Sequence, residues 1–177
     1  MTIEDVKMLL SANGIPYEIH YYTNEGEFWR HLDMYAHVEK AKPYGTTVIV
    51  IRSKNGQKDI EIQFNTTEEA CVFVDMFFGS YSFELFDWKE ELLPNEMLRL
   101  ITCISQCKFT VVTVHDLKRK RWIGDLSFDS ENDYEESYYK REMAKINRPL
   151  SFLEKISRCK RQYEIYDFEK YQCVIKG

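Results

Sequence analysis

The chain has 177 residues, of which 44% are hydrophobic and 30% are charged, and its formal net charge is −5. A chain of this length can bury a sizeable core without disulfides or a structural metal, and its composition is that of a globular protein. No run of about 18 apolar residues occurs, which excludes a hydrophobic membrane-spanning helix, and the acidic balance argues against a general nucleic-acid binder.

Local signals along the chain predict alternating helices and strands. Thr2 suits a helix N-cap, Asn13-Gly14 suits a helix end, and Thr66 with Glu69 forms a capping-box pattern ahead of an apolar run. The predicted helices span about residues 3–12, 24–41, 70–78, 95–105, 130–147 and 150–160. The predicted strands span about residues 17–22, 46–54, 57–64, 81–86, 108–117, 122–128, 163–168 and 171–175.

The clearest element is a hairpin around Asn55-Gly56, the dipeptide preferred in two-residue type I′ turns. Such a turn fixes the register of the two strands and gathers their apolar side chains on one face. Arg52 and Asp59 are expected to meet as a charge pair on the other face. The expected apolar pairs are Ile51–Ile60, Ile49–Ile62 and Thr47–Phe64.

These elements predict a single α+β domain over residues 1–177, with a mixed or mostly antiparallel sheet. The sheet is expected to be built from two hairpins, at about residues 46–64 and 108–128, and to pack with five or six helices. The order of elements in residues 1–90 is echoed in residues 91–177, which suggests a weak pseudo-repeat.

The second hairpin places His115 beside Asp116, a combination that could suggest an acid–base pair. In the predicted register His115 opposes Gly124 and shares a face with Trp122 and Leu126. Neighbouring residues on a strand point to opposite faces, so Asp116 cannot orient the imidazole of His115. We therefore predict a structural histidine.

Two charged blocks, one at the tip of this hairpin and one directly after it, are the candidate partner-binding residues. Residues 1–100 hold 17 Asp/Glu against 9 Lys/Arg, whereas residues 101–177 hold 12 against 15. The basic tip could contact phosphates or an acidic partner, and the acidic run could meet a basic protein. The candidates are Lys118, Arg119, Lys120, Arg121 and Trp122 in the basic block, and Asp129, Glu131, Asp133, Tyr134, Glu135 and Glu136 in the acidic block.

No pattern in the chain predicts a metal or a cofactor. Asp129–Asp133 lacks the central glycine and the final glutamate of a calcium loop, and His31 and His37 do not have helical metal-ligand spacing. The cysteines are odd in number and widely spread, which favours reduced thiols in the cytosol. They are Cys71, Cys103, Cys107, Cys159 and Cys173.

The predicted order of elements in residues 2–87 is helix, strand, hairpin, helix, strand, and Glu61-Ile62-Gln63 falls on the second strand of the hairpin. This arrangement resembles the core of restriction-endonuclease-like nucleases, which carry an Asp/Glu-x-Lys motif at that place. Here glutamine replaces the lysine, and residues 43–47 supply no acid for the first metal position. The resemblance implies a degenerate nuclease.

The sequence as a whole leads us to expect a non-enzymatic cytosolic protein that binds another macromolecule and could inhibit it, as immunity proteins and anti-nuclease inhibitors do. The expected partner is a protein, with a basic protein matching the acidic half of the chain. Two alternatives stay open. One is an enzyme with a dispersed site, formed by Glu61 with Gln63 or by His115 with a cysteine. The other is a nucleic-acid-binding module that uses residues 118–121.

Overall fold

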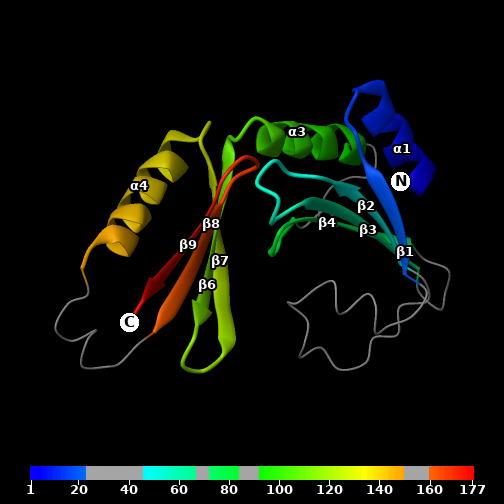
Figure 1. The fold of residues 1–177 in the computed structure, drawn as a ribbon. Coiled ribbons are helices and arrows are strands. Elements are labelled where there is room, and N and C mark those ends of the chain that lie inside the picture. Colours follow the sequence, from blue (N-terminus) through cyan, green and yellow to red (C-terminus); the bar gives the residue numbers. More distant parts are fainter. Residues whose placement is uncertain (23–45, 67–71, 84–91, 150–159) are drawn as a thin grey trace. The chain divides into compact units, whose positions relative to one another are not determined.

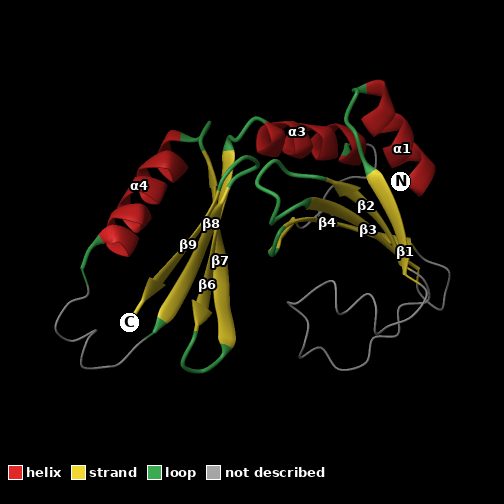
Figure 2. Ribbon diagram, in the orientation of Figure 1, coloured by secondary structure: helices red, strands yellow, loops and turns green. Residues whose placement is uncertain are grey.

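The computed structural model describes residues 1–22, 46–66, 72–83, 92–149 and 160–177. The helix predicted at 24–41 lies outside these residues, as does nearly all of the helix predicted at 150–160. The chain divides into two compact units, unit 1 (Met1–Thr102) and unit 2 (Cys103–Gly177). Each unit contains its own antiparallel sheet (Figures 1 and 2).

Unit 1 combines helices with a five-stranded sheet in which every strand pairs with its neighbour in sequence, in the order β1-β2-β3-β4-β5. All four pairings are antiparallel. The last turn of α3 runs past the boundary of the unit. The elements are α1 (Ile3–Ala12), β1 (Glu18–Tyr22), β2 (Thr46–Ile51), β3 (Ile60–Thr66), β4 (Val72–Phe78), β5 (Tyr81–Phe83) and α3 (Leu93–Ser105).

Helix α1 begins and ends where the sequence predicts. The Thr2 side chain accepts a hydrogen bond from the Asp5 backbone N–H, and the Asp5 carboxylate accepts one from the Thr2 N–H, which completes a capping box. The hydrogen bond from the Thr2 backbone N–H to the Asp5 carboxylate, with a smaller contribution from the Thr2 side chain, holds the pKa of Asp5 below its ordinary value. The helix ends at the Asn13 cap, and Gly14 follows with a φ of +64°, a conformation that glycine adopts without steric cost.

The predicted register of the first hairpin is confirmed. Ile51 lies opposite Ile60, Ile49 opposite Ile62, and Thr47 opposite Phe64. Because side chains alternate along a strand, the four isoleucines and Phe64 gather on one face, where all five are buried.

The predicted type I′ turn is wrong, although the register that it implied is right. The strands end at Ile51 and Ile60, so residues 52–59 form the connection. Gly56 has a φ of +66°, but Asn55 lacks the positive φ that a type I′ turn needs. Instead, the Asn55 side-chain oxygen accepts hydrogen bonds from the N–H groups of Gln57 and Lys58. This Asx-type turn is an alternative use of asparagine at a chain reversal.

The helix predicted at 70–78 is also wrong, because residues 72–78 form strand β4. The strand pairs with β3 along its whole length, from Thr66 opposite Val72 to Ile60 opposite Phe78. A short apolar run without polar alternation fits a buried strand as well as a buried helix, and the β-branched and aromatic residues of VFVDMFF favour the strand. Gly79, with a φ of +58°, then turns the chain into β5.

One face of the five-stranded sheet carries the core of unit 1. Met76 and Phe78 of β4 lie on the same face as the hairpin isoleucines and are fully buried. Val6 and Leu10 of α1 and Met97 of α3 are buried as well, and Figure 1 shows both helices on one side of this sheet. The opposite face carries Glu61 and Gln63 together with the buried side chains of Val48, Val50 and Phe77.

The described residues of unit 2 form a four-stranded antiparallel sheet and one helix. The strand order is β7-β6-β8-β9, so β7 and β9 are the edges. The predicted helix at 130–147 begins three residues later than expected, behind an Asn132 N-cap. The elements are β6 (Phe109–Asp116), β7 (Arg121–Asp129), α4 (Asp133–Asn147), β8 (Arg161–Tyr166) and β9 (Tyr171–Lys176).

The register predicted for the second hairpin is wrong, by two residues at the tip and by one residue beyond a bulge. His115 lies opposite Trp122, not Gly124, and the register shifts between Val114 and His115, so that Ile123 is an extra residue in β7. This bulge leaves His115 and Trp122 on a common face, as expected, but moves Leu126 to the other face, opposite Val112. A bulge cannot be recognised from the alternation of hydrophobic residues alone.

The core of unit 2 lies between α4 and the sheet. Phe128 of β7 stacks against Tyr138 and Tyr139 of α4, with ring centroids 5.8 and 4.9 Å apart. Val112, Ile146 and Ile165 complete the buried cluster. Further residues packed against it are Val114, Leu126, Tyr138, Tyr139, Met143, Tyr163 and Val174.

The α+β class is confirmed, but the predicted single mixed sheet with five or six helices is wrong. The described residues form two antiparallel sheets, of five and four strands, and three helices. Within the same residues, no helix is long and apolar enough to cross a membrane. The difference in architecture follows mainly from residues 72–78, which extend a sheet rather than covering it.

Candidate partner-binding surface

The two charged blocks predicted as partner-binding residues lie at opposite ends of unit 2. The basic block forms the β6–β7 turn and the start of β7, whereas the acidic block begins where β7 ends. Eight steps along a strand at about 3.3 Å each separate Arg121 from Asp129 by roughly 25 Å. A single compact site cannot therefore include both blocks, and each has to be considered by itself.

Most carboxylates of the acidic block are used in local structure. Asp129 accepts a hydrogen bond from the Glu131 N–H, and Glu135 accepts one from the Asp129 N–H. Glu131 forms an ion pair with Lys108 at 2.6 Å, which raises the pKa of that lysine, and Glu136 pairs with Lys140 at 2.8 Å. These contacts close the β7–α4 connection and pair two of the negative charges.

The remaining members of the acidic block have different environments. Asp133 is the first residue of α4. Tyr134 is one of the most exposed large side chains in the described part of the chain, at 78%. The acidic block therefore has a structural role at the start of α4, a position that acidic residues commonly occupy.

The turn of the basic block is organised by Asp116. Its Oδ1 accepts hydrogen bonds from the N–H groups of Lys118 and Arg119, both at 3.0 Å, and these bonds lower the pKa of Asp116. Lys120 closes the turn with a φ of +51°. Asp116 thus holds the backbone of the turn, which leaves it unavailable as a partner for His115 on the other face of the sheet.

The cations of this turn project into solvent. Arg119 approaches Asp116 at 3.9 Å, a long and exposed contact. Lys118, Lys120 and Arg121 are exposed and form no ion pair with any residue that the structure describes. Charges held apart from carboxylates in this way are those best able to meet an acidic group on a partner.

Further basic residues that are distant in sequence lie at the same end of unit 2. Asp116 pairs with Arg161 across β6 and β8, and the Leu117 N–H donates to the Lys160 carbonyl at 2.9 Å. Arg161 in turn lies opposite Lys176 in β9.

The C-terminal end of α4 joins this group through Lys176. Its ammonium donates hydrogen bonds to the carbonyl oxygens of Lys145 and Arg148, at 3.0 and 2.6 Å, and so caps the end of the helix. We call the whole cluster the basic end of unit 2. Its cations are Lys118, Arg119, Lys120, Arg121, Lys145, Arg148, Lys160, Arg161 and Lys176.

Two large apolar side chains are exposed within the basic end. Trp122 is 51% exposed and Ile123 is 47% exposed, and they occupy consecutive positions at the β7 bulge. The Trp122 indole N–H donates to Asp125 at 3.3 Å, which fixes the ring on the face of His115. Ile123 lines a groove on the α4 side of the sheet. The bulge thus presents one apolar side chain toward each face.

The groove lies between α4 and the four-stranded sheet and has a volume of about 460 Å³. Its floor is apolar, formed by side chains of β6, β7, β8 and α4, and charged residues stand around it. The apolar lining residues are Val112, Val114, Ile123, Gly124, Leu126, Ile146 and Tyr163, and the charged ones are Asp125, Glu142, Lys145, Arg148 and Arg161.

The opposite face of the same sheet carries His115, but not beside a cysteine. His115 Nε2 lies 3.8 Å from Glu164 Oε1, which also accepts a hydrogen bond from Gln162. Cys173 of β9 lies opposite Glu164 of β8, and β8 lies between β9 and β6, the strand of His115. The side chains of His115 and Cys173 are therefore about 10 Å apart or more. That separation is too long for the hydrogen bond of a nucleophile and its base.

The same face contains a tyrosine with a perturbed pKa. Burial, with a further contribution from the Glu164 carboxylate, raises the pKa of Tyr171 to about 12. Its hydroxyl therefore stays protonated and can donate a hydrogen bond at any physiological pH. This is the behaviour of a structural tyrosine near a carboxylate.

In unit 1, Glu61 and Gln63 lie on the face of the sheet opposite the hairpin isoleucines. Gln63 Nε2 donates a hydrogen bond to Glu61 Oε2 at 3.3 Å. The helix required between β3 and the next strand for the nuclease resemblance is absent, because β4 occupies residues 72–78. Residues 43–45 lie outside the described part of the chain. Within the described part, no group of three or more His, Cys, Asp or Glu side chains could hold a metal ion.

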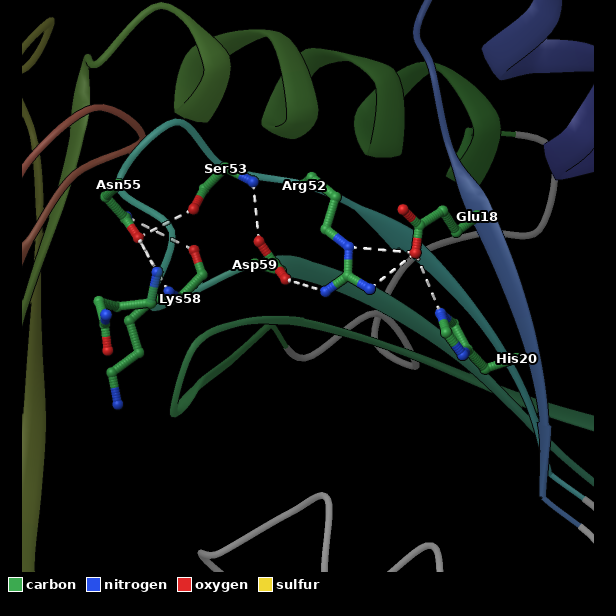
Figure 3. Close-up of polar contacts among 8 residues, drawn as sticks. Glu18, His20, Arg52, Ser53, Asn55, Lys58 and Asp59 are labelled. Atoms are coloured by element: carbon green, nitrogen blue, oxygen red, sulfur yellow. Dashed lines mark hydrogen bonds and ion pairs between the residues drawn. The ribbon is translucent and has the colours of Figure 1, made fainter.

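The most connected polar cluster of unit 1 centres on Arg52 (Figure 3). Its guanidinium donates to Glu18 of β1 and to Asp59, each at 2.7 Å, and His20 lies 3.3 Å from the same Glu18 oxygen. Arg52, with a smaller contribution from His20, holds the pKa of Glu18 below its ordinary value, and the carboxylates raise that of Arg52. The predicted Arg52–Asp59 pair is thus confirmed and ties β1 to the β2–β3 connection.

Asp59→Ala is expected to lower the free energy of unfolding by about 1–2 kcal/mol, measured by urea denaturation. The side chain is largely buried, and it accepts a hydrogen bond from the Ser53 N–H at 2.8 Å besides its ion pair. Asp59→Asn keeps an oxygen for Ser53 and should recover part of the loss. Equal losses in both variants would show that the charge, and not the Ser53 bond, provides the stabilisation.

Comparison of the whole chain with protein-family models, with curated proteins and with solved structures returned no match.

Proposed function

We propose that the chain is a non-enzymatic binding protein that attaches to an acidic protein partner through the basic end of unit 2, and could inhibit that partner by covering it. The observation that carries the proposal is the gathering of cations from separate segments around the exposed Trp122 and Ile123. Unit 2 holds 15 Lys/Arg against 12 Asp/Glu, and most of this excess of positive charge lies at the basic end.

A protein is a better match for this surface than a nucleic acid. Tryptophan and arginine are the side chains most enriched at energetically important positions of protein interfaces. A nucleic-acid groove would be expected to offer a series of aromatic platforms for stacking bases, whereas the groove here has a mainly aliphatic floor.

The proposed partner is acidic rather than basic because of how the two charged blocks are used. Glu131 and Glu136 of the acidic block have lysine partners in unit 2, and Glu135 has a backbone partner. The lysines at 118 and 120 have no such counterpart among the described residues. Binding of an oppositely charged surface by these two lysines therefore breaks no ion pair between described residues.

Reversing three charges of the basic end, with Lys118→Glu, Lys120→Glu and Arg121→Glu, is expected to weaken binding to fluorescent poly-L-glutamate by roughly tenfold or more. These side chains are exposed, so the fold should be retained. Binding is measured by fluorescence anisotropy at several salt concentrations. The affinity of the unaltered chain should fall as salt rises, because exposed charges are screened.

The matched control reverses Lys140, Arg141 and Lys170 to glutamate, which gives the same net charge without altering the basic end. It should bind poly-L-glutamate much more tightly than the first variant. Equal weakening in both variants, or no binding of poly-L-glutamate at all, would overturn the proposal. Tighter binding of oligo(dT) than of poly-L-glutamate would replace it with the nucleic-acid alternative, and binding of poly-L-lysine alone would restore a basic partner.

A further inference from the structure

We infer that the groove between α4 and the four-stranded sheet receives a bulky apolar side chain from an acidic peptide segment of the partner. The inference rests on the proposed function and specifies how the same surface would recognise its ligand. Charge at the basic end would attract the segment, and the groove would select it by one buried side chain.

The groove is suited to a single large side chain. Its volume of about 460 Å³ lies within the range of small ligand sites, and its floor is formed by Val112, Val114, Leu126 and Ile146. Val112 and Ile146 belong to the buried cluster of unit 2, so the floor is held by the core itself. Binding at such a floor needs little rearrangement of the protein.

Gly124 explains why the groove is open. It is a β7 residue that lines the groove, and a Cβ added to it would meet no other atom within 4 Å. Its φ is not positive, so the backbone does not require glycine at this position. The space beside it corresponds to a side chain that this strand lacks, which a partner could supply.

The charges around the groove define the chemistry of the segment. Arg148 and Arg161 are exposed at the groove, and a guanidinium can bind a carboxylate with two parallel hydrogen bonds. Among the charged residues of the lining, Glu142 pairs with Lys145, Asp125 accepts from Trp122, and Arg148 and Arg161 have contacts of their own. A ligand with carboxylates on either side of an apolar residue therefore complements both the lining and the surrounding basic end.

The test compares blocked pentapeptides with the sequence Glu-Glu-Xaa-Glu-Glu, where Xaa is glycine, leucine or phenylalanine. All three have the same charge, so any difference in affinity reports the apolar side chain. Burial of a leucine or phenylalanine side chain is expected to tighten binding by roughly tenfold or more over glycine. In labelled protein, the methyl signals of Val112, Leu126 and Ile146 should shift with the leucine peptide.

The Gly124 series separates the groove from the charges. Gly124→Val should fold at least as well as the natural chain, because valine suits a strand and the space is empty. It should remove the preference for leucine and phenylalanine, so that the three peptides bind with about the same affinity. Gly124→Ala, with a much smaller side chain, should retain most of the preference.

Three results would overturn the inference. The first is equal affinity for the three peptides in the natural chain, which would leave charge-driven binding, and hence the proposed function, intact. The second is an apolar preference that survives in Gly124→Val. The third is the absence of methyl shifts at the groove on binding of the leucine peptide. Loss of binding to all the peptides, by contrast, would count against the proposed function as well.

Discussion

Replacing Phe128 with alanine is expected to lower the free energy of unfolding of unit 2 by about 3–5 kcal/mol, one of the two largest effects of any substitution considered for this chain. The ring is 3% exposed and lies at the centre of the unit 2 core. It contacts both Tyr138 and Tyr139, so its removal leaves a cavity that α4 cannot fill without shifting. Urea denaturation followed by tyrosine fluorescence measures the loss.

Two companion variants show whether the loss comes from the cavity. Phe128→Leu keeps most of the volume and should cost less than the alanine variant. Tyr134→Ala removes an aromatic side chain of α4 that is 78% exposed, and its effect should lie within about 0.5 kcal/mol of zero. A Phe128→Ala loss as small as that of Tyr134→Ala would contradict the core described for unit 2.

The proposed binding surface depends on this core. α4 holds Arg148 and one wall of the groove in place, and it packs on the sheet through Tyr138 and Tyr139, which contact Phe128, and through its buried Ile146. Phe128→Ala should therefore also reduce the preference for leucine and phenylalanine peptides, even under conditions where unit 2 stays folded. Hydrogen exchange at the amides of α4 would reveal the loosened helix directly.

The part of the fold that could be predicted is the part that depends on local pattern. The capping residues of α1 and the register of β2 and β3 follow from neighbours in sequence, and both are found in the structure. The register held even though the Asn55 turn differs, because the alternating isoleucines independently fix which residues face each other. The turn dipeptide and the alternation of isoleucines predicted the same register, and the alternation alone was sufficient.

The errors arose where a local signal had to compete with pairing between distant segments. Thr66 and Glu69 resemble a capping box, yet Thr66 ends β3 and the apolar run after it completes a sheet. Ile123 looks like one of several alternating residues, yet it is the extra residue of a bulge. In both cases the decisive interaction is with another strand, which the pattern of one segment does not contain.

The candidate site divides in the same way. The basic turn and Trp122 were visible as a cluster in sequence, whereas the contributions of Lys145, Arg148, Arg161 and Lys176 required the strand order β7-β6-β8-β9. The groove could not be predicted, because it depends on the absence of a side chain at Gly124 facing α4. A glycine within a strand was the one signal in the sequence that could have suggested it.

Replacing Ile62 with alanine is expected to lower the free energy of unfolding of unit 1 by about 2–5 kcal/mol. Ile62 is completely buried in the central strand β3, between Ile49 of β2 and Met76 of β4. The matched control is Ile175→Ala, the same chemical change at a β9 side chain that is 58% exposed, which should cost far less. Urea denaturation gives the loss, and hydrogen exchange at the amides of β2, β3 and β4 places it in unit 1.

A double-mutant cycle extends this prediction to the element that the sequence pattern misassigned. Ile62 lies directly opposite Met76, so Ile62→Ala and Met76→Ala should be coupled by about 0.5 kcal/mol or more. Ile62→Ala and Ile146→Ala, which lie in different units, should have additive effects. If residues 72–78 were a helix, Met76 would have no fixed cross-strand contact with Ile62. Additivity of the Ile62 and Met76 substitutions would therefore refute the pairing of β3 with β4, and with it the five-stranded sheet.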